Sequence, residues 1–124
     1  MGYVTTALKG YWGRIANDEN GSLVVQCIFE HSPPQSKAPV LNEILTALHE
    51  ISKGQWGNWV VQHILDHGTA SEKSIVFKTV LRDVYGMSVD QYASKVVEKA
   101  LRTAGKWELT EMINVVISRK NDNM

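Results

Sequence analysis

Residues 57–62 read Gly-Asn-Trp-Val-Val-Gln, and this pattern occurs three times along the chain. The other copies are Gly-Ser-Leu-Val-Val-Gln at 21–26 and Ala-Ser-Lys-Val-Val-Glu at 93–98. The three copies align without gaps at a constant spacing of 36 residues. A fixed period of this length is typical of proteins built from stacked units, in which each unit buries its apolar face on its neighbours.

The apolar residues between the copies follow the same period. Their steps of four, four and three residues are those of one face of an α-helix. The two stripes are Val40, Ile44, Leu48 and Ile51 and, 36 residues later, Val76, Val80, Val84 and Met87. No strand-like alternation extends over more than a few residues. The sequence therefore predicts an all-α solenoid.

Glycines and capping residues indicate where helices begin. Gly21 and Gly57 are expected to break the chain, so that a second helix of each unit begins at Ser22, Asn58 and Ser94. Further along the chain, the segment 69–72 has the spacing of a capping box at the start of the next helix.

The period divides the chain into units of about 8–36, 37–72 and 73–108, followed by a further helix at about 109–118. No polar capping repeat is evident at either end, so we expect 1–124 to be a fragment of a longer array. Apolar stripes would then be exposed around Val4 and Leu8 and around Met112 and Val116. Such end faces favour self-association.

Composition excludes several classes of protein. The 124 residues are 44% hydrophobic and 21% charged, which is ordinary for a globular domain. The formal net charge is zero, unlike that of proteins that bind nucleic acid through bulk positive charge. No apolar run is long enough to span a bilayer, and no leader opens the chain, so we expect an intracellular protein.

No pattern in the sequence indicates catalysis, a metal site or a cofactor. Cys27 is the single cysteine, which excludes an internal disulfide, and no base is paired with it in the sequence. His63 and His67 are spaced as metal ligands can be, yet no third strong ligand is in register with them. There is no glycine-rich phosphate loop. We therefore expect a binding protein and no enzyme.

The 36-residue period and the signature ending in Gln or Glu resemble the Pumilio (PUF) family. Residues 55–68 resemble the sixth of eight repeats in a typical Pumilio domain, 90–99 the seventh, and the unit around Ser22 the fifth. The resemblance implies a right-handed α-solenoid of three-helix repeats. On this interpretation 1–124 is a partial Pumilio homology domain that binds RNA.

The geometry of the signature suits base recognition. In the segments that begin at Ser22, Asn58 and Ser94, the first and fifth residues lie on one helix face and can reach one base edge. The second residue lies about 100° round the helix and can slide between bases. The third and fourth residues, valines in every unit, point toward the core.

The resemblance assigns one base to each unit. The base-edge pairs are Ser22 with Gln26, Asn58 with Gln62, and Ser94 with Glu98. In that order they match the family's pairs for adenine, uracil and guanine. The carboxylate of Glu98 can accept hydrogen bonds from both N1–H and N2–H of guanine. Because the family reads RNA antiparallel, the predicted triplet is 5′-G-U-A-3′, within a UGUA-type element.

The stacking positions are held by Leu23, Trp59 and Lys95. Trp59 offers an aromatic platform, Leu23 offers only apolar contact, and Lys95 can lie across a base or meet a phosphate. Many members of the family place Arg, Tyr or His where Leu23 stands.

Two functions follow from these residues. The resemblance implies sequence-specific binding of single-stranded RNA in mRNA 3′-untranslated regions, and cytoplasmic repression with deadenylase or translational repressor partners. The alternative is a solenoid that binds protein, with weak or no RNA binding. The charge of the concave face separates them, because cations gathered there would favour RNA. The candidates are Lys9, Arg14, Lys53, Lys95 and Lys99.

Overall fold

The computed structural model describes residues 8–122, apart from the side chains at 116 and 119–122. Within this part the chain forms nine helices and no strand, which confirms the all-α prediction. None of these helices is long and apolar enough to cross a membrane. The helices are α2 (Trp12–Ala16), α3 (Glu19–His31), α4 (Pro34–Thr46), α5 (Leu48–Ser52), α6 (Gly57–His67), α7 (Ala70–Arg82), α8 (Val84–Val89), α9 (Ala93–Thr103) and α10 (Lys106–Asp122).

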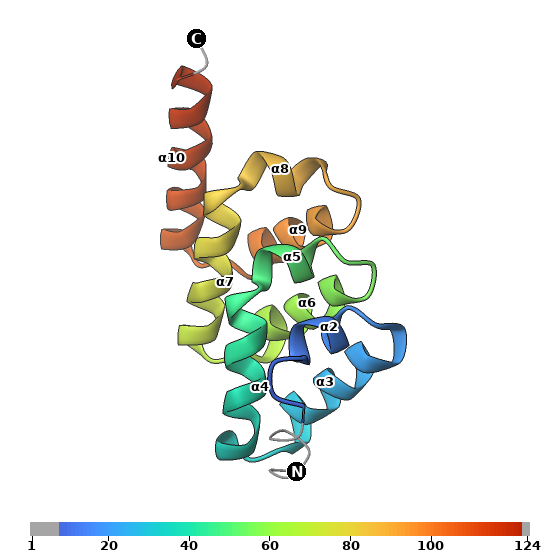
Figure 1. The fold of residues 1–124 in the computed structure, drawn as a ribbon. Helices are drawn as coiled ribbons and strands as arrows, with labels where there is room; N and C mark the ends of the chain where they lie inside the picture. The colour runs from blue at the N-terminus through green and yellow to red at the C-terminus, as the bar shows by residue number, and fades with distance from the viewer. Residues whose placement is uncertain (1–7, 123–124) are drawn as a thin grey trace.

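The helices stack in three columns, as expected for a solenoid (Figure 1). One column contains α4, α7 and α10, a second contains α3, α6 and α9, and a third contains the short helices α2, α5 and α8. In the second column α6 packs against both α3 and α9. This column brings the three copies of the signature side by side, which is the arrangement that the period predicts.

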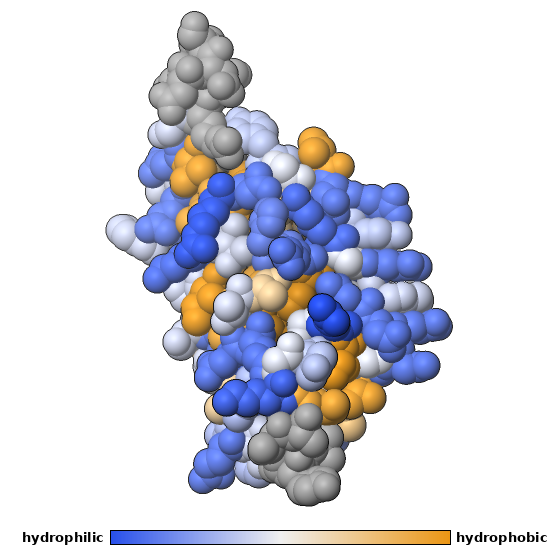
Figure 2. All heavy atoms as spheres, viewed as in Figure 1, coloured by the Kyte–Doolittle hydropathy of each residue, from blue (hydrophilic) through white to orange (hydrophobic). Residues whose placement is uncertain are grey.

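The two apolar stripes form the centre of the core. Seven of their eight residues are at most 2% exposed, and Val84 is 7% exposed. The core continues from Trp12 at one end to Met112 at the other. Burial of this kind contributes about 1.5–3 kcal/mol for each large apolar side chain. The face shown in Figure 2 is mostly hydrophilic, with hydrophobic residues in separate patches.

Each stripe is divided between two helices, although its spacing predicts one continuous helix. The chain leaves helical geometry at Ala47, between α4 and α5, and at Asp83, between α7 and α8. The Asp83 side chain then accepts a hydrogen bond from the Gly86 N–H and caps α8. The bend lets α4 pack on α7 while α5 turns to pack on α6, so both halves of the stripe stay buried.

The two glycines of the signature do not break the chain. Gly21 lies inside α3, which begins at Glu19, and Gly57 is the first residue of α6. A Cβ on Gly21 would stand 2.1 Å from the Ile15 carbonyl oxygen, and one on Gly57 would stand 2.5 Å from that of Ile51. Glycine is therefore needed where the short helix of the unit closely approaches the second-column helix.

The helix boundaries confirm one expectation and change another. The capping box is present, since the Thr69 hydroxyl accepts from the Glu72 N–H and the Glu72 carboxylate accepts from the Thr69 N–H. The last helix, α10, begins at Lys106 and is longer than the expected 109–118. At the other end Val4 lies outside the described residues, and Leu8 lies in a turn that packs against the core.

Candidate nucleic-acid interface

The signature valines point inward in the second column. Val25, Val61 and Val97 are buried, as are Val60 and Val96. Val24, the remaining member, lies in the first of the three helices and is 49% exposed. Apart from Val24, the structure therefore confirms the expected inward direction of the third and fourth positions, and the remaining positions are left to form a surface.

The second positions stand on that surface. Leu23 is 63% exposed, Trp59 is 49% exposed, and Lys95 is exposed as well. These three side chains bound two hollows, which we call the α3–α6 slot and the α6–α9 slot. The α3–α6 slot is lined by Glu19, Ser22, Leu23, Gln26, Trp56 and Trp59. The α6–α9 slot is lined by Trp59, Gln62, Lys95, Glu98, Lys99 and Arg102.

Each slot has the parts that recognition of one base requires. Second-position side chains from two consecutive helices form its walls, and fifth-position residues line it. Trp59 belongs to both slots, so one indole ring can stack on a base from either side. The Lys95 ammonium lies 5.6 Å from the centre of the Trp59 ring, within the range of a cation–π contact. A base that enters the α6–α9 slot must displace this ammonium or take its place over the ring.

The first positions are less accessible than the sequence suggests. Ser22 is 2% exposed and Asn58 is fully buried, whereas Ser94 is half-buried. Each side chain donates to the carbonyl oxygen three residues earlier, over distances of 3.1, 2.8 and 3.4 Å respectively. The first position thus satisfies a backbone carbonyl at the start of its helix.

The Asn58 amide is fully engaged within its own unit. Its Nδ2 donates to the carbonyl oxygens of Gly54 and Gln55, and its Oδ1 accepts from Gln62 Nε2 at 2.9 Å. We expected Asn58 and Gln62 each to offer an amide to the same base. In this arrangement Gln62 reaches the slot and Asn58 supports it from behind, so a base gains access to Asn58 only if these bonds exchange.

The fifth positions remain accessible. Gln26 and Gln62 are half-buried, and Glu98 is exposed. An amide presents one donor and one acceptor, whereas a carboxylate presents acceptors only. Glu98 accepts from Arg102 Nη2, one helical turn further along α9. The structure therefore places two amides and one carboxylate in a row along the second column, in the order that the sequence predicts.

The five cations proposed for the concave face do not gather on one surface. Lys95 and Lys99 line the α6–α9 slot, whereas Lys9 and Arg14 line hollows beside α2. Lys53 follows α5 and lies 3.8 Å from the Asp83 carboxylate. Of the two slots, only the α6–α9 slot is lined by cations, and Arg102 adds to the two lysines there. The lining of the α3–α6 slot includes the acidic Glu19 and no cation.

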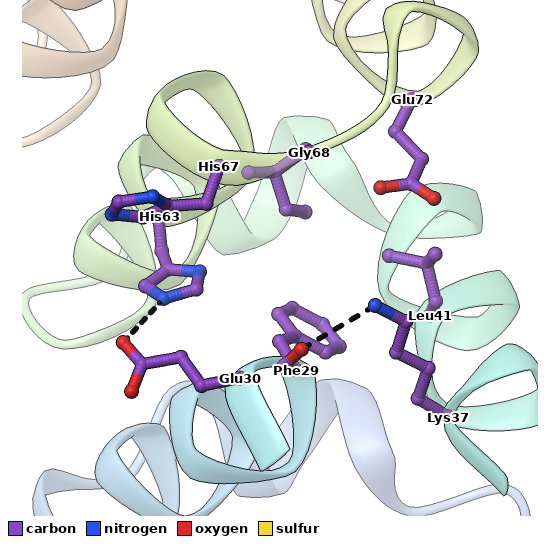
Figure 3. Close-up of a pocket in the computed structure, with 9 residues that line it drawn as sticks. Phe29, Glu30, Lys37, Leu41, His63, His67, Gly68 and Glu72 are labelled. Atoms are coloured by element: carbon purple, nitrogen blue, oxygen red, sulfur yellow. Dashed lines mark hydrogen bonds and ion pairs between the residues drawn. The ribbon is translucent and has the colours of Figure 1, made fainter. Parts of the chain in front are cut away.

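A further hollow lies away from both slots, between the ends of α3 and α6 and the start of α4 (Figure 3). There His63 Nε2 lies 2.9 Å from Glu30 Oε1, and its ring centre lies 4.8 Å from that of His67. The hydrogen bond from His63 lowers the pKa of the Glu30 carboxyl below its ordinary value. No group of three His, Cys, Asp or Glu residues suited to a metal ion occurs among the described residues. His63 therefore joins one unit to the next.

Three lining residues were missed in the sequence. Trp56 and Glu19 precede the segments that begin at Asn58 and Ser22, where the pattern gives no reason to seek site residues. Arg102 follows Glu98 by four residues, a spacing that pairs side chains on a helix, so the sequence did contain a signal for it.

Comparison with known proteins supports the resemblance to the Pumilio family. A family model described as "Pumilio-family RNA binding repeat" matches the chain three times, at residues 11–45, 48–81 and 83–117. The matched repeats begin near the short helices α2, α5 and α8, and so at a different phase of the period from the units inferred from sequence. The chain is also 43% identical over 53 residues to Meiotic coiled-coil protein 2 of Schizosaccharomyces pombe, covering 43% of this chain and 8% of that protein.

The fold is similar to those of solved RNA complexes. The crystal structure of PUF-8 in complex with PBE-RNA superposes with a TM-score of 0.83 and 26% identity, over 91% of this chain and 34% of that one. The Puf3 RNA binding domain, bound to site A of the Cox17 RNA 3′ UTR recognition sequence, gives 0.79 and 25%, over 88% of this chain and 32% of that one. The chain thus spans about a third of these domains.

Proposed function

The chain belongs to the Pumilio family of RNA-binding, non-enzymatic repeat proteins, and from this premise we propose that α3, α6 and α9 bind three consecutive RNA bases. The observation that carries the proposal is that the two slots lie at equivalent places between successive units. Both lie between consecutive helices of one column, and both are walled by second-position side chains. The Pumilio fold supports sequence-specific RNA binding, in which each repeat reads one base with two or three side chains.

The proposed triplet is 5′-G-U-A-3′. Glu98 accepts from the two adjacent donors of guanine, while Gln62 offers one donor and one acceptor to uracil and Gln26 offers the same to adenine. The first-position residues Ser94 and Ser22 hold the start of each helix beside the base. In the middle unit we propose that the uracil edge replaces the Gln62–Asn58 hydrogen bond, which lets the Gln62 amide turn toward the base.

We further propose that the target lies in mRNA 3′-untranslated regions and that binding leads to repression of the message in the cytoplasm. The Puf3 domain, similar in fold, was solved on a 3′ UTR recognition sequence. Deadenylase or translational repressor proteins are the proposed partners. Three units bind at most three bases, so the affinity of this chain alone is expected to be well below that of a longer array.

The test replaces the first- and fifth-position residues of the third unit with those of the second unit. Ser94→Asn together with Glu98→Gln replaces the carboxylate with an amide that complements uracil. The preferred triplet is expected to move from G-U-A toward U-U-A. A good base-edge pair is worth about 1–3 kcal/mol of discrimination, by analogy with direct readout in DNA. The measurement is competition binding with short RNAs that differ only at this base.

The matched control is Glu111→Gln, which removes an exposed carboxylate from α10, outside both slots. It should leave the base preference unchanged. If wild type shows no preference for guanine, or if the double variant keeps it, the base code is wrong. Failure to bind any short RNA at all would favour the alternative, a solenoid that binds protein.

A further inference from the structure

The three units provide an internal comparison at two positions of the second column. At the fifth position of the signature the residues are Gln26, Gln62 and Glu98. One helical turn later they are Glu30, Asp66 and Arg102. Where the base-edge residue is a neutral amide, the residue one turn on is acidic. Where the base-edge residue is a carboxylate, the residue one turn on is an arginine.

The contacts of these residues change with the sign of their charge. Glu30 and Asp66 both reach forward to the next helix of the column, where they pair with His63 and Lys99 at 2.9 Å. Arg102 instead turns back along its own helix, and its Nη2 donates to Glu98 Oε1. The structure describes no second-column helix after α9, so the third unit has no forward partner of this kind here, and Arg102 contacts the base-edge residue of its own helix.

We propose that Arg102 is a positioning residue that sets the strength of guanine recognition by holding the Glu98 carboxylate in the α6–α9 slot. This inference rests on the proposed RNA-binding function and deepens it. Both residues line the slot, together with Trp59 and Lys95. Arg102 makes no contact with guanine in this proposal and acts through Glu98 alone.

Glu98 needs such a partner because of its exposure. Its side chain is 60% exposed, and a mobile carboxylate must be ordered before it can meet both guanine donors. A carboxylate has about four acceptor positions, so one bond from Arg102 leaves enough for N1–H and N2–H. An arginine bond already formed in the free protein removes part of the ordering cost.

An acid at position 102 would have the opposite effect. It would lie one turn from Glu98, where like charges repel, and would drive the carboxylate away from its place in the slot. The acidic residues Glu30 and Asp66 are tolerated in the other units because Gln26 and Gln62 carry no charge. The sign at this position thus follows the charge of the base-edge residue.

The experiment measures binding of the 124-residue chain to four short RNAs that carry G, A, U or C opposite α9 and are otherwise identical. Arg102→Gln is expected to lower affinity for the guanine RNA about three- to tenfold, the range expected for ordering one long side chain at an interface. Affinity for the other three RNAs should hardly change. Arg102→Lys should restore part of the preference, because an ammonium can still pair with Glu98. Arg102→Glu should abolish it.

The matched control is Arg82→Gln, which removes the same charge from the exposed end of α7, and circular dichroism confirms folding of each variant. An equal loss of affinity for all four RNAs, with a weaker salt dependence of binding, would show that Arg102 binds phosphate. That result would overturn the proposal. An unchanged guanine preference in Arg102→Gln would overturn it too. If wild type itself has no guanine preference, the proposed base code has failed, which is a distinct result.

Discussion

Asn58 shows how one side chain serves both folding and binding. It is fully buried, makes three hydrogen bonds, and still lies directly behind Gln62, the residue that is proposed to face the base. Its equivalents Ser22 and Ser94 make one hydrogen bond of the same kind each. The first position of the signature is thus fixed by the start of its helix, and this leaves the fifth position to carry the accessible chemistry.

The Asn58→Ala variant should therefore be clearly less stable than wild type. It removes the side-chain donor to the Gly54 and Gln55 carbonyls, of which Gly54 keeps the backbone N–H of residue 58, and it removes the acceptor of Gln62. Such losses at a buried site cost about 1–3 kcal/mol. Ser94→Ala is the control, because it removes one 3.4 Å hydrogen bond from a half-buried site. Urea unfolding measures both. Equal stability of the two variants would contradict the role given to Asn58.

Asp90 links the stability of α9 to pH. Its carboxylate accepts from the backbone N–H groups of Ala93 and Tyr92, and these bonds lower its pKa below the ordinary value of 3.8. A carboxyl with a lowered pKa stabilises the folded state fully above its unfolded pKa. That stabilisation is lost as the pH falls through the folded-state pKa.

Asp90→Ala should accordingly destabilise the chain at pH 7 by about 1 kcal/mol, the usual net contribution of a hydrogen bond, because the Tyr92 and Ala93 N–H groups lose their acceptor. The difference from wild type should shrink as the pH falls below 3.8. Urea unfolding between pH 7 and pH 2.5 measures it, with Glu111→Ala as the control for loss of an exposed carboxylate. A difference that stays constant over this range would show that the ionised carboxylate does not stabilise the start of α9.

At the scale of the helices, close approach decides which residues stand at the start of each second-column helix. The short helix of each unit packs directly on the long one, α2 on α3, α5 on α6 and α8 on α9. In the first two units there is no room for a Cβ at Gly21 or Gly57. The third unit has Ala93 at this position, fully buried, so a Cβ is accommodated there.

Gly57→Ala should destabilise the chain even though alanine is the better helix former. The added Cβ would meet both the carbonyl oxygen and the side chain of Ile51, at 2.5 and 2.8 Å, and overpacking of this kind costs about 1–3 kcal/mol. Gly13→Ala is the matched control, because its Cβ would meet only Ala47 at 3.9 Å. Thermal unfolding should show a lower midpoint for the first variant and an equal or higher one for the second.

At the scale of the whole molecule, units are joined by equivalent contacts that end at two open faces. Glu30 pairs with His63 as Asp66 pairs with Lys99, and the core runs through all units. At one end Val24 is 49% exposed, whereas its equivalents Val60 and Val96 are fully buried. At the other end Ile113 is 52% exposed, whereas its equivalents Leu41 and Phe77 are buried. Met112, expected to be exposed, is itself 3% exposed, and the side chain of Val116 lies outside the described residues.

The two open faces should make this chain associate end to end at high concentration, because each presents what an adjacent unit covers elsewhere in the array. Ile113→Glu should weaken the association by placing a charge in the contact. Val89→Glu is the control, since Val89 is 85% exposed at the end of α8 and its equivalents Asn17 and Lys53 are exposed too, so an adjacent unit does not cover this position. Light scattering across a concentration series measures both, and a wild-type chain that stays monomeric throughout would contradict the prediction.

The sequence alone determined the period, the helical class and the order of the base-edge residues. The period could be found because equivalent units bury equivalent residues, so the apolar stripes and the valines of the signature recur at 36 residues. The family resemblance followed from the same signature. The identity of Gln26, Gln62 and Glu98 needed no coordinates, because hydrogen-bonding capacity belongs to the residue type.

Only the tertiary structure decided how these residues are used. It divided each stripe at Ala47 and Asp83, turned Asn58 inward, and separated Lys9 and Lys53 from the slot that holds Lys95. It also brought Arg102 onto Glu98. These outcomes depend on distances between helices and on competition among hydrogen-bond partners. Such distances arise when whole units pack together, and spacing along the chain does not contain them.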